Sequence, residues 1–424
     1  MNNNKRWLYL GMATISTLFL GLIYAWSLFR TPFAEVFKTW TVAQMSMTFT
    51  ISMIMFCLGG LIGGHLGKVF GVKLRILISG ALLLIGFFMV STLNPADASG
   101  SLTKLYIFYG VFGGGGVGVG YNAVITTITK WFPDKVGLAS GIMLMGFGLG
   151  GLALGSVVTK FIAKYGIFST FKILAITIFV VMVVAAIIIK APEASATGAS
   201  KAAASDDKVH HYSAAEMMKT GRFWVFFIWA VALNSAGLMV INSAANISLA
   251  YGGSAVLGMI VSLFNGAGRI VTGNNFDKFG RKTTAIVNNL FMFIAGVLLV
   301  IGGMSHSLIA IVVGLIFVGL AYGGTPTLTS AYINKAFGHK YFPTNFSIAN
   351  FSLIPAAIIG PNISAKLLEA AGGKYDSNFY ALIVFTLVAF VLWVALNVTS
   401  KKSDNEAVSY THLTLPTKRI YLTN

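Results

Sequence analysis

Charge is scarce in this chain. Only 10% of its 424 residues are charged, whereas 56% are hydrophobic, and the mean hydropathy is +0.80. Soluble domains carry about 25% charged residues, so this composition excludes a soluble globule and indicates an integral membrane protein whose surroundings are the lipid bilayer. The single cysteine, Cys57, excludes a disulfide framework. A net charge of +18 would suggest nucleic acid for a soluble protein, but the basic residues here lie mainly between hydrophobic runs, so no nucleic-acid partner is expected.

Acidic residues are the scarcest group. None of the 12 Asp and Glu residues falls inside a hydrophobic run that is long enough to cross a bilayer, which argues against a carboxylate proton relay. Clusters of His, Asp, Glu or Cys are also missing from these runs, which argues against a membrane-embedded enzyme, and no cofactor or metal is expected. The glycine-rich residues 110–120 lack the Lys and the Ser or Thr of a phosphate-binding loop, so we interpret them as helix packing.

Hydrophobic runs of about 20 residues, the length that crosses a bilayer as a helix, recur along the chain. We expect an all-α membrane protein with twelve spans, six on each side of a polar break. The first six fall near residues 7–29, 43–67, 74–93, 104–129, 136–159 and 169–189, and the second six near 222–248, 254–272, 283–303, 306–332, 343–368 and 378–398. Pro355 and Pro361 are expected to bend or break the eleventh span, as a gate or as a static kink.

The polar break defines the expected domains. Residues 191–220 are rich in Ala, Ser and charge and predict a flexible cytoplasmic linker between a first bundle, residues 1–190, and a second bundle, residues 221–400. Residues 401–424 become polar and Thr-rich, and we suspect a non-native extension there. Basic residues are denser in the loops that lie on the same side of the membrane as the N-terminus. The positive-inside rule therefore places both termini in the cytoplasm and the protein in the cell membrane.

A short glycine-bounded turn occurs twice. The residues GHLGKVFG (64–71) follow the second span, and GNNFDKFG (273–280) follow the eighth with the same glycine spacing. Basic residues come after each copy. A turn of this kind lets two helices approach closely, and its recurrence at matching places predicts two duplicated, pseudo-symmetric six-helix bundles.

One arginine lies inside the eighth span. Arg269 is the sole ionisable side chain in residues 257–272, and the sequence offers it no acidic partner inside a span. A charge there costs at least about 2.5 to 3.5 kcal/mol, so such residues usually face a bundle interior and mark a transport path. The alternative is that Arg269 extends along the helix to the cytoplasmic surface. In the first case a bound anion is its best counterion, because a guanidinium matches a carboxylate with two parallel hydrogen bonds.

Together, the twelve spans, the central linker and the repeated turn resemble the major facilitator superfamily. Within it, the chain is similar to the oxalate/formate antiporter family of bacterial carboxylate carriers over about residues 5–400. The more specific matches are GLIYAWS (21–27), KWFPDKVGLASG (130–141), the pair Phe223 and Trp224, and residues 264–282.

The resemblance implies a substrate site. It makes Arg269 the residue that binds the substrate carboxylate and places Tyr24, Tyr121 and Tyr322 at aromatic positions of the cavity. Trp26 and Asn265 are further candidates, although aromatic residues are common at membrane interfaces and asparagines often join helices.

The resemblance also implies a gate, and two departures from the family accompany it. We expect Asp277, Arg281 and Lys68 in gating. Lys68 stands where the superfamily turn carries an aspartate, which leaves Asp277 as the single copy of that acid. Leu353 stands at the place of a lysine that helps the oxalate carrier hold a dianion.

These residues predict a secondary transporter, and not an enzyme, that moves a small organic anion by alternating access. With one intramembrane cation, a monocarboxylate such as formate, acetate or lactate is the expected substrate, and a monomer is the expected state. A drug or metabolite exporter that does not select carboxylates is the alternative, and a dispensable Arg269 would favour it.

Overall fold

Helices make up every regular element that the structure describes. The structure is a computed structural model that describes residues 3–192 and 211–413. The first half contains α1 (Asn3–Leu20), η1 (Gly21–Ala25), α2 (Trp26–Val36), α3 (Val42–Leu66), α4 (Val72–Val90), α5 (Ala98–Leu105), the π-helix η2 (Tyr106–Gly113), α6 (Gly114–Ile128), η3 (Thr129–Trp131) and α7 (Val136–Ile188). The second half contains α9 (Ala214–Lys219), α10 (Gly221–Ile241), α11 (Ala244–Ala250), α12 (Ala255–Gly258), α13 (Ile260–Ser305), α14 (Leu308–Phe337), α15 (Phe342–Asn350), α16 (Leu353–Ala370) and α17 (Asp376–Leu413).

Ten helical runs of the described chain are long and apolar enough to cross a membrane. Two of them, α7 with 53 residues and α13 with 46, are about twice the length that a single crossing needs. Each is interrupted by a glycine, Gly166 (φ 76°, ψ 167°) or Gly280 (φ 74°, ψ −177°), in a backbone region that is essentially reserved for glycine. Each therefore supplies two crossings, and the expected twelve spans are confirmed.

The two copies of the repeated turn differ in backbone conformation. In the second copy the helix continues to Gly280, which turns the chain with a positive φ. In the first copy α3 ends at Leu66, and Gly71 instead begins α4 as an N-cap residue with φ −63° and ψ 165°. The equal glycine spacing therefore places the turn at matching positions in the two halves, but the backbone conformation of the turn differs between them.

Some expected spans are shorter or broken. The seventh ends at Ile241 instead of residue 248, and the eighth starts at Ile260 after the short helices α11 and α12. The eleventh is split into α15 and α16. Pro355 explains this split: it has no N–H for the Phe351 carbonyl, which instead accepts a hydrogen bond from Ile354 at 3.1 Å. Pro361, in contrast, lies inside α16.

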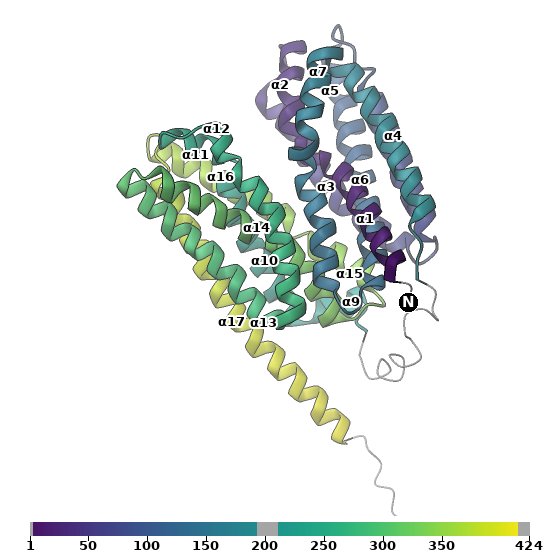
Figure 1. The fold of residues 1–424 in the computed structure, drawn as a ribbon, viewed down its shortest axis with the longest axis vertical. Helices are drawn as coiled ribbons and strands as arrows, with labels where there is room; N and C mark the ends of the chain where they lie inside the picture. Colours follow the sequence, from purple (N-terminus) through teal and green to yellow (C-terminus); the bar gives the residue numbers. More distant parts are fainter. Residues whose placement is uncertain (1–2, 193–210, 414–424) are drawn as a thin grey trace, which may run out of the picture.

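The helices form the two bundles expected from the repeat. In Figure 1 the purple-to-teal helices α1 to α7 form one group and most of the green-to-yellow helices from α10 to α17 form the other, while α15 lies beside the first group near the N-terminus. The groups meet near the N-terminus, and their ribbons diverge toward the opposite end, where α2, α5, α11 and α12 lie (Figure 1). We call the end at which the two bundles meet the N-terminal end of the structure.

Part of the expected flexible linker, residues 211–219, is docked on the second bundle. The Tyr212 N–H donates to the Phe337 carbonyl at 3.1 Å, and the Asn345 side chain donates to the Tyr212 carbonyl at 2.9 Å. Ser213 and Glu216 form a capping box that starts α9, and Met217 is fully buried. The expectation of flexibility is therefore wrong for these residues, because one apolar side chain and one cap suffice to dock them. Residues 193–210 lie outside the described part. At the other terminus, α17 continues through residue 401 of the expected tail to Leu413.

Candidate functional site

Arg269 lies in the first crossing of α13 and is 3% exposed. It does not extend to the surface of the protein. Its Nε donates to the Asn265 side chain, one turn earlier, at 3.3 Å, and its Nη1 donates to the Leu144 carbonyl of α7 at 2.6 Å. The Leu144 carbonyl belongs to the other bundle, so the guanidinium bridges the seam between the bundles.

One guanidinium nitrogen, Nη2, has no hydrogen-bond partner among the described residues. It is not among their fully buried unpartnered polar atoms, so part of its surface is accessible. No carboxylate lies within ion-pair distance of Arg269 in residues 3–192 and 211–413. Carbonyl groups solvate this cation without neutralising it.

Two of the expected tyrosines lie near this arginine, one from each bundle. The hydroxyls of Tyr121 in α6 and Tyr322 in α14 are both within electrostatic range of the Arg269 guanidinium. Both side chains are buried, at 4% and 7% exposure, yet neither hydroxyl is among the fully buried unpartnered atoms of the described residues. Neither hydroxyl makes a hydrogen bond among the described residues, so each can donate to a ligand.

Tyr121 is held by an aromatic cluster that itself crosses the seam. Its ring centroid lies 5.1 Å from that of Phe56 and 4.7 Å from that of Phe147, and it stacks on Phe346 of α15 at 5.9 Å. Tyr322 packs against Gly237, whose missing side chain leaves room for the ring. These contacts fix both rings, so their hydroxyls present a defined direction to the site.

Trp26 is not brought to Arg269. It begins α2 and packs among aromatic rings of the first bundle, with its centroid 4.8 Å from Tyr109 and 6.1 Å from Phe33. Its indole nitrogen is buried without a partner. The Trp26 ring therefore packs in the first bundle, and its contact with a substrate stays a prediction. Tyr24 lies in η1, but its side chain is outside the described residues.

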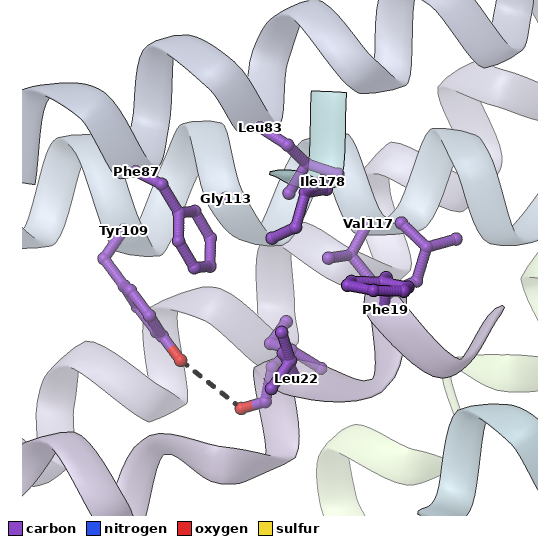
Figure 2. A pocket seen from close by; sticks show the side chains of 10 residues that line it. Phe19, Leu22, Leu83, Phe87, Tyr109, Gly113, Val117 and Ile178 are labelled. Carbon is purple, nitrogen blue, oxygen red and sulfur yellow. Dashed lines mark hydrogen bonds between the residues drawn. The ribbon is translucent and has the colours of Figure 1, made fainter. Parts of the chain in front are cut away.

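An apolar pocket inside the first bundle is separate from the Arg269 site. Figure 2 shows Phe19, Leu22, Leu83 and Val117 around it, with the Tyr109 hydroxyl directed to the Ile23 carbonyl at 3.5 Å. Its lining contains no charged side chain. It therefore offers an anion nothing to pair with, and we place the candidate site at Arg269.

Asp277 connects the two bundles at the N-terminal end of the structure. Its two carboxylate oxygens accept hydrogen bonds from the backbone N–H groups of Gly137 at 2.8 Å and Leu138 at 2.7 Å, at the start of α7. An acid at a helix N-terminus satisfies open donors and complements the helix dipole. Gly137 and Gly273 allow this approach, because a Cβ on Gly273 would lie 2.2 Å from the Gly137 carbonyl oxygen.

The other two gating candidates are placed differently. The Arg281 guanidinium lies 5.6 Å from the ring centre of Tyr332, which belongs to the same bundle. Lys68 is exposed in its turn, and its ammonium forms no ion pair with the described residues. On the Lys68 side the seam is closed by a neutral group instead: the Asn122 side chain donates to the Pro343 carbonyl at 2.7 Å and to the Ser347 hydroxyl at 2.8 Å.

Sequence reasoning missed Leu144 and Gly148. Leu144 acts through its backbone carbonyl, which has no signature in the side-chain pattern. Gly148 belongs to a glycine-rich run, residues 146–151, in which the sequence does not distinguish one glycine from another. In the structure the run faces two ways: Gly146 and Gly150 pack against α1, while Gly148 packs against the Arg269 guanidinium. To distinguish Gly148 from Gly146 and Gly150, one would have to know which face of α7 lies opposite Arg269.

The comparisons with known proteins agree with this architecture. A family profile described as Major Facilitator Superfamily matches residues 6–353 and 230–423. The chain belongs to the Major Facilitator Superfamily and is a membrane transporter.

Among similar sequences is the oxalate:formate antiporter of Oxalobacter formigenes, 26% identical over 92% of this chain and 90% of the relative. An uncharacterized transporter of this superfamily, YhjX of Escherichia coli, is 26% identical over 78% of this chain and 80% of the relative. The proton:xylose symporter XylE, solved with 6-bromo-6-deoxy-D-glucose, has a TM-score of 0.73 at 16% identity and covers 93% of this chain and 95% of its own. That identity shows the fold alone.

Proposed function

We propose that this protein is a secondary transporter of small organic anions, with monocarboxylates preferred, and that Arg269 pairs with the carboxylate. The observation that carries the proposal is a guanidinium that is 3% exposed, has no acidic partner in the described chain and keeps Nη2 open. A bound anion neutralises such a charge where the protein does not. Tyr121 and Tyr322 supply hydroxyl donors to the same ligand from the two bundles.

Transport follows from the position of this site at the seam. Two bundles that rock about a central site expose it alternately to either side of the membrane. We assign the bundles to residues 1–190 and 221–400, place both termini and the N-terminal end in the cytoplasm of a bacterial cell, and take the monomer as the working unit. In this assignment the structure is closed toward the cytoplasm, with Asp277 as the latch.

Relatives support the substrate class. The relatives include an oxalate:formate antiporter, a bovine monocarboxylate transporter that is 25% identical over 32% of this chain, and a probable nitrate transporter of Staphylococcus carnosus that is 32% identical over 38% of this chain. All of these names describe small anions. We therefore extend the class, but no individual substrate, to this chain.

Charge counting separates monoanions from dianions. With Arg269 as the one buried cation that we assign to the site, a monocarboxylate leaves no net charge, whereas a dicarboxylate leaves one negative charge. Two opposite charges about 4 Å apart gain about 4 kcal/mol at an effective dielectric near 20, so a second cation decides between these classes. Leu353, at the start of α16, does not supply it.

An uptake screen tests the proposal. The purified protein is reconstituted into proteoliposomes, and uptake of labelled formate, acetate, lactate and oxalate is measured with and without the same anion preloaded inside. We expect saturable monocarboxylate uptake that exceeds oxalate uptake. Uptake of hydrophobic cations with no carboxylate uptake would identify an exporter of a different class and overturn the proposal.

A further inference from the structure

The Arg269 guanidinium lies flat on the backbone of the opposite bundle. A Cβ on Gly148 would lie 2.8 Å from Cζ, 2.9 Å from Nε and 2.9 Å from Nη2 of Arg269. Three nearly equal distances mean that the guanidinium plane faces this glycine. Since such distances are shorter than van der Waals contact, any side chain at position 148 would displace the group.

The Leu144 carbonyl fixes the same group from one turn away. Leu144 and Gly148 are four residues apart on α7 and so lie on one face of the helix. The Leu144 carbonyl accepts a hydrogen bond from Nη1, and Gly148 packs against the plane of the guanidinium. The Asn265 side chain, on the same helix as Arg269, accepts a hydrogen bond from Nε. With these positions set, Nη2 is the part of the guanidinium that is left for a ligand.

We propose that Leu144, through its carbonyl, and Gly148 form a guanidinium seat that orients Arg269 for anion binding. Gly148 is thus a positioning residue for the substrate. The inference rests on the proposed function, because it concerns how the same arginine is presented. Holding a flexible arginine in its binding geometry before the ligand arrives raises affinity by removing an ordering cost.

The seat has a consequence for the transport cycle. Leu144 and Gly148 belong to the first bundle and Arg269 to the second, so the seat exists only while α7 and the first crossing of α13 are in contact. Separation of these helices removes the carbonyl and the supporting glycine together. Anion affinity is therefore higher in the conformation seen here than in the conformation that opens the N-terminal end, which favours release there.

Gly148→Ala tests the seat, because the three atoms nearest to the alanine Cβ would all belong to the Arg269 guanidinium, the far end of a flexible side chain. The fold is retained and the guanidinium moves. Gly266→Ala is the matched control: it lies in the same seam, and the three atoms nearest to its Cβ would all belong to the Leu149 side chain, at 2.9 to 3.1 Å. Both variants perturb the same helix pair to a similar extent.

We expect Gly148→Ala to raise KM by about 10-fold or more, as for loss of a hydrogen bond to a charged group, with kcat changed far less. Gly266→Ala should leave KM within about twofold. In the Arg269→Lys background, Gly148→Ala should no longer raise KM, because an ammonium has no planar group to displace. Equal KM increases in the two alanine variants, or an undiminished effect of Gly148→Ala in the lysine background, would overturn the seat.

Labelled nitrate, a planar monoanion without a carboxylate, is run beside the monocarboxylates to separate the two proposals. Nitrate uptake that depends on Gly148, without any carboxylate uptake, would sustain the seat and overturn the organic-anion proposal. Carboxylate uptake with no dependence on Gly148 would sustain the organic-anion proposal and overturn the seat. A wild-type protein that takes up neither anion would overturn both.

Discussion

The Asp277 carboxylate accepts a hydrogen bond of 2.8 Å from the backbone N–H of Gly137, across the seam between the two bundles. Its second oxygen accepts from the next N–H of the same helix end at 2.7 Å. This contact and the Arg269 bridge lie on the same two helices, α7 and α13. The latch and the proposed substrate residue therefore close and open together.

Asp277→Asn should slow turnover with little change in substrate affinity. The amide keeps one acceptor but loses the negative charge at the start of α7, which costs about 0.5 to 2 kcal/mol at a helix N-terminus and weakens the closed state. We expect kcat to fall by about 3- to 30-fold, with KM within about twofold. Initial-rate uptake measures both constants.

Asp134→Asn is the matched control for that variant. Asp134 pairs with Arg6 inside the first bundle at 2.9 Å, and its side chain is 48% exposed, so its ion pair contributes little. Its turnover should stay close to that of the wild type. An Asp277→Asn protein with normal turnover and a large loss of affinity would assign Asp277 to substrate binding.

Gly273→Ala should open the seam at the N-terminal end. The new Cβ would lie 2.2 Å from the Gly137 carbonyl oxygen and 2.6 Å from its carbon, and backbone cannot move aside as a side chain does. Spin labels at Lys68→Cys and Lys278→Cys, after Cys57→Ser, report the separation of the bundles. We expect a longer distance than in the labelled protein without the alanine.

Gly11→Ala provides the control for this measurement, because a Cβ on that α1 glycine meets nothing within 4 Å. It should leave the distance distribution unchanged. The same distribution in Gly273→Ala and in the control would show that the close glycine contact does not hold the seam.

Gly280→Ala should destabilise the fold, while Gly71→Ala should not. The two glycines occupy matching places in the repeated turn, and neither Cβ would meet an atom within 4 Å. They differ in φ, which is 74° at Gly280 and −63° at Gly71. A residue forced into the first conformation costs about 1 to 3 kcal/mol, so thermal unfolding in detergent should shift down for Gly280→Ala alone. Equal shifts would mean that the strain is not decisive.

Leu353→Lys should move substrate preference toward dicarboxylates. A second cation near the site would compensate the second charge of oxalate, whereas the wild type should prefer a monoanion. Competition of unlabelled oxalate and lactate against labelled lactate measures the change. Leu353→Met, which keeps the apolar character, should not alter the order. Tighter oxalate than lactate binding in the wild type would reveal a cation that the charge count omits.

Much of this architecture is predictable from sequence because the membrane imposes a simple rule. Twelve apolar runs, the repeated glycine turn and an isolated intramembrane arginine follow from the cost of burying backbone and charge in lipid. The burial of Arg269 and the absence of an acidic partner in the described residues agree with that reasoning. Trp26 shows its limit, because an aromatic side chain satisfies core packing and cavity lining equally well at the level of composition.

What sequence could not supply is contact between backbones. The Leu144 carbonyl, the Gly137 N–H and the close approach of Gly137 to Gly273 involve groups that nearly every residue carries. The helix break before Pro355 was expected only to within a turn, because a proline shifts the hydrogen bonds of residues before it. Docking of Tyr212 likewise depends on a backbone group, the Phe337 carbonyl at the end of α14.

Anion binding by Arg269→Gln is the most direct test of the account. Purified wild type, Arg269→Gln and Arg269→Lys are compared by the thermal shift that lactate or formate produces, after confirming equal unfolding temperatures without ligand. We expect the glutamine variant to insert and fold normally but to bind at least about 100-fold more weakly, as for removal of one partner of a buried ion pair. Lysine should restore binding only in part, because an ammonium has no planar group that Leu144 and Gly148 can orient toward the ligand. Wild-type binding and uptake by Arg269→Gln would contradict the proposed mechanism.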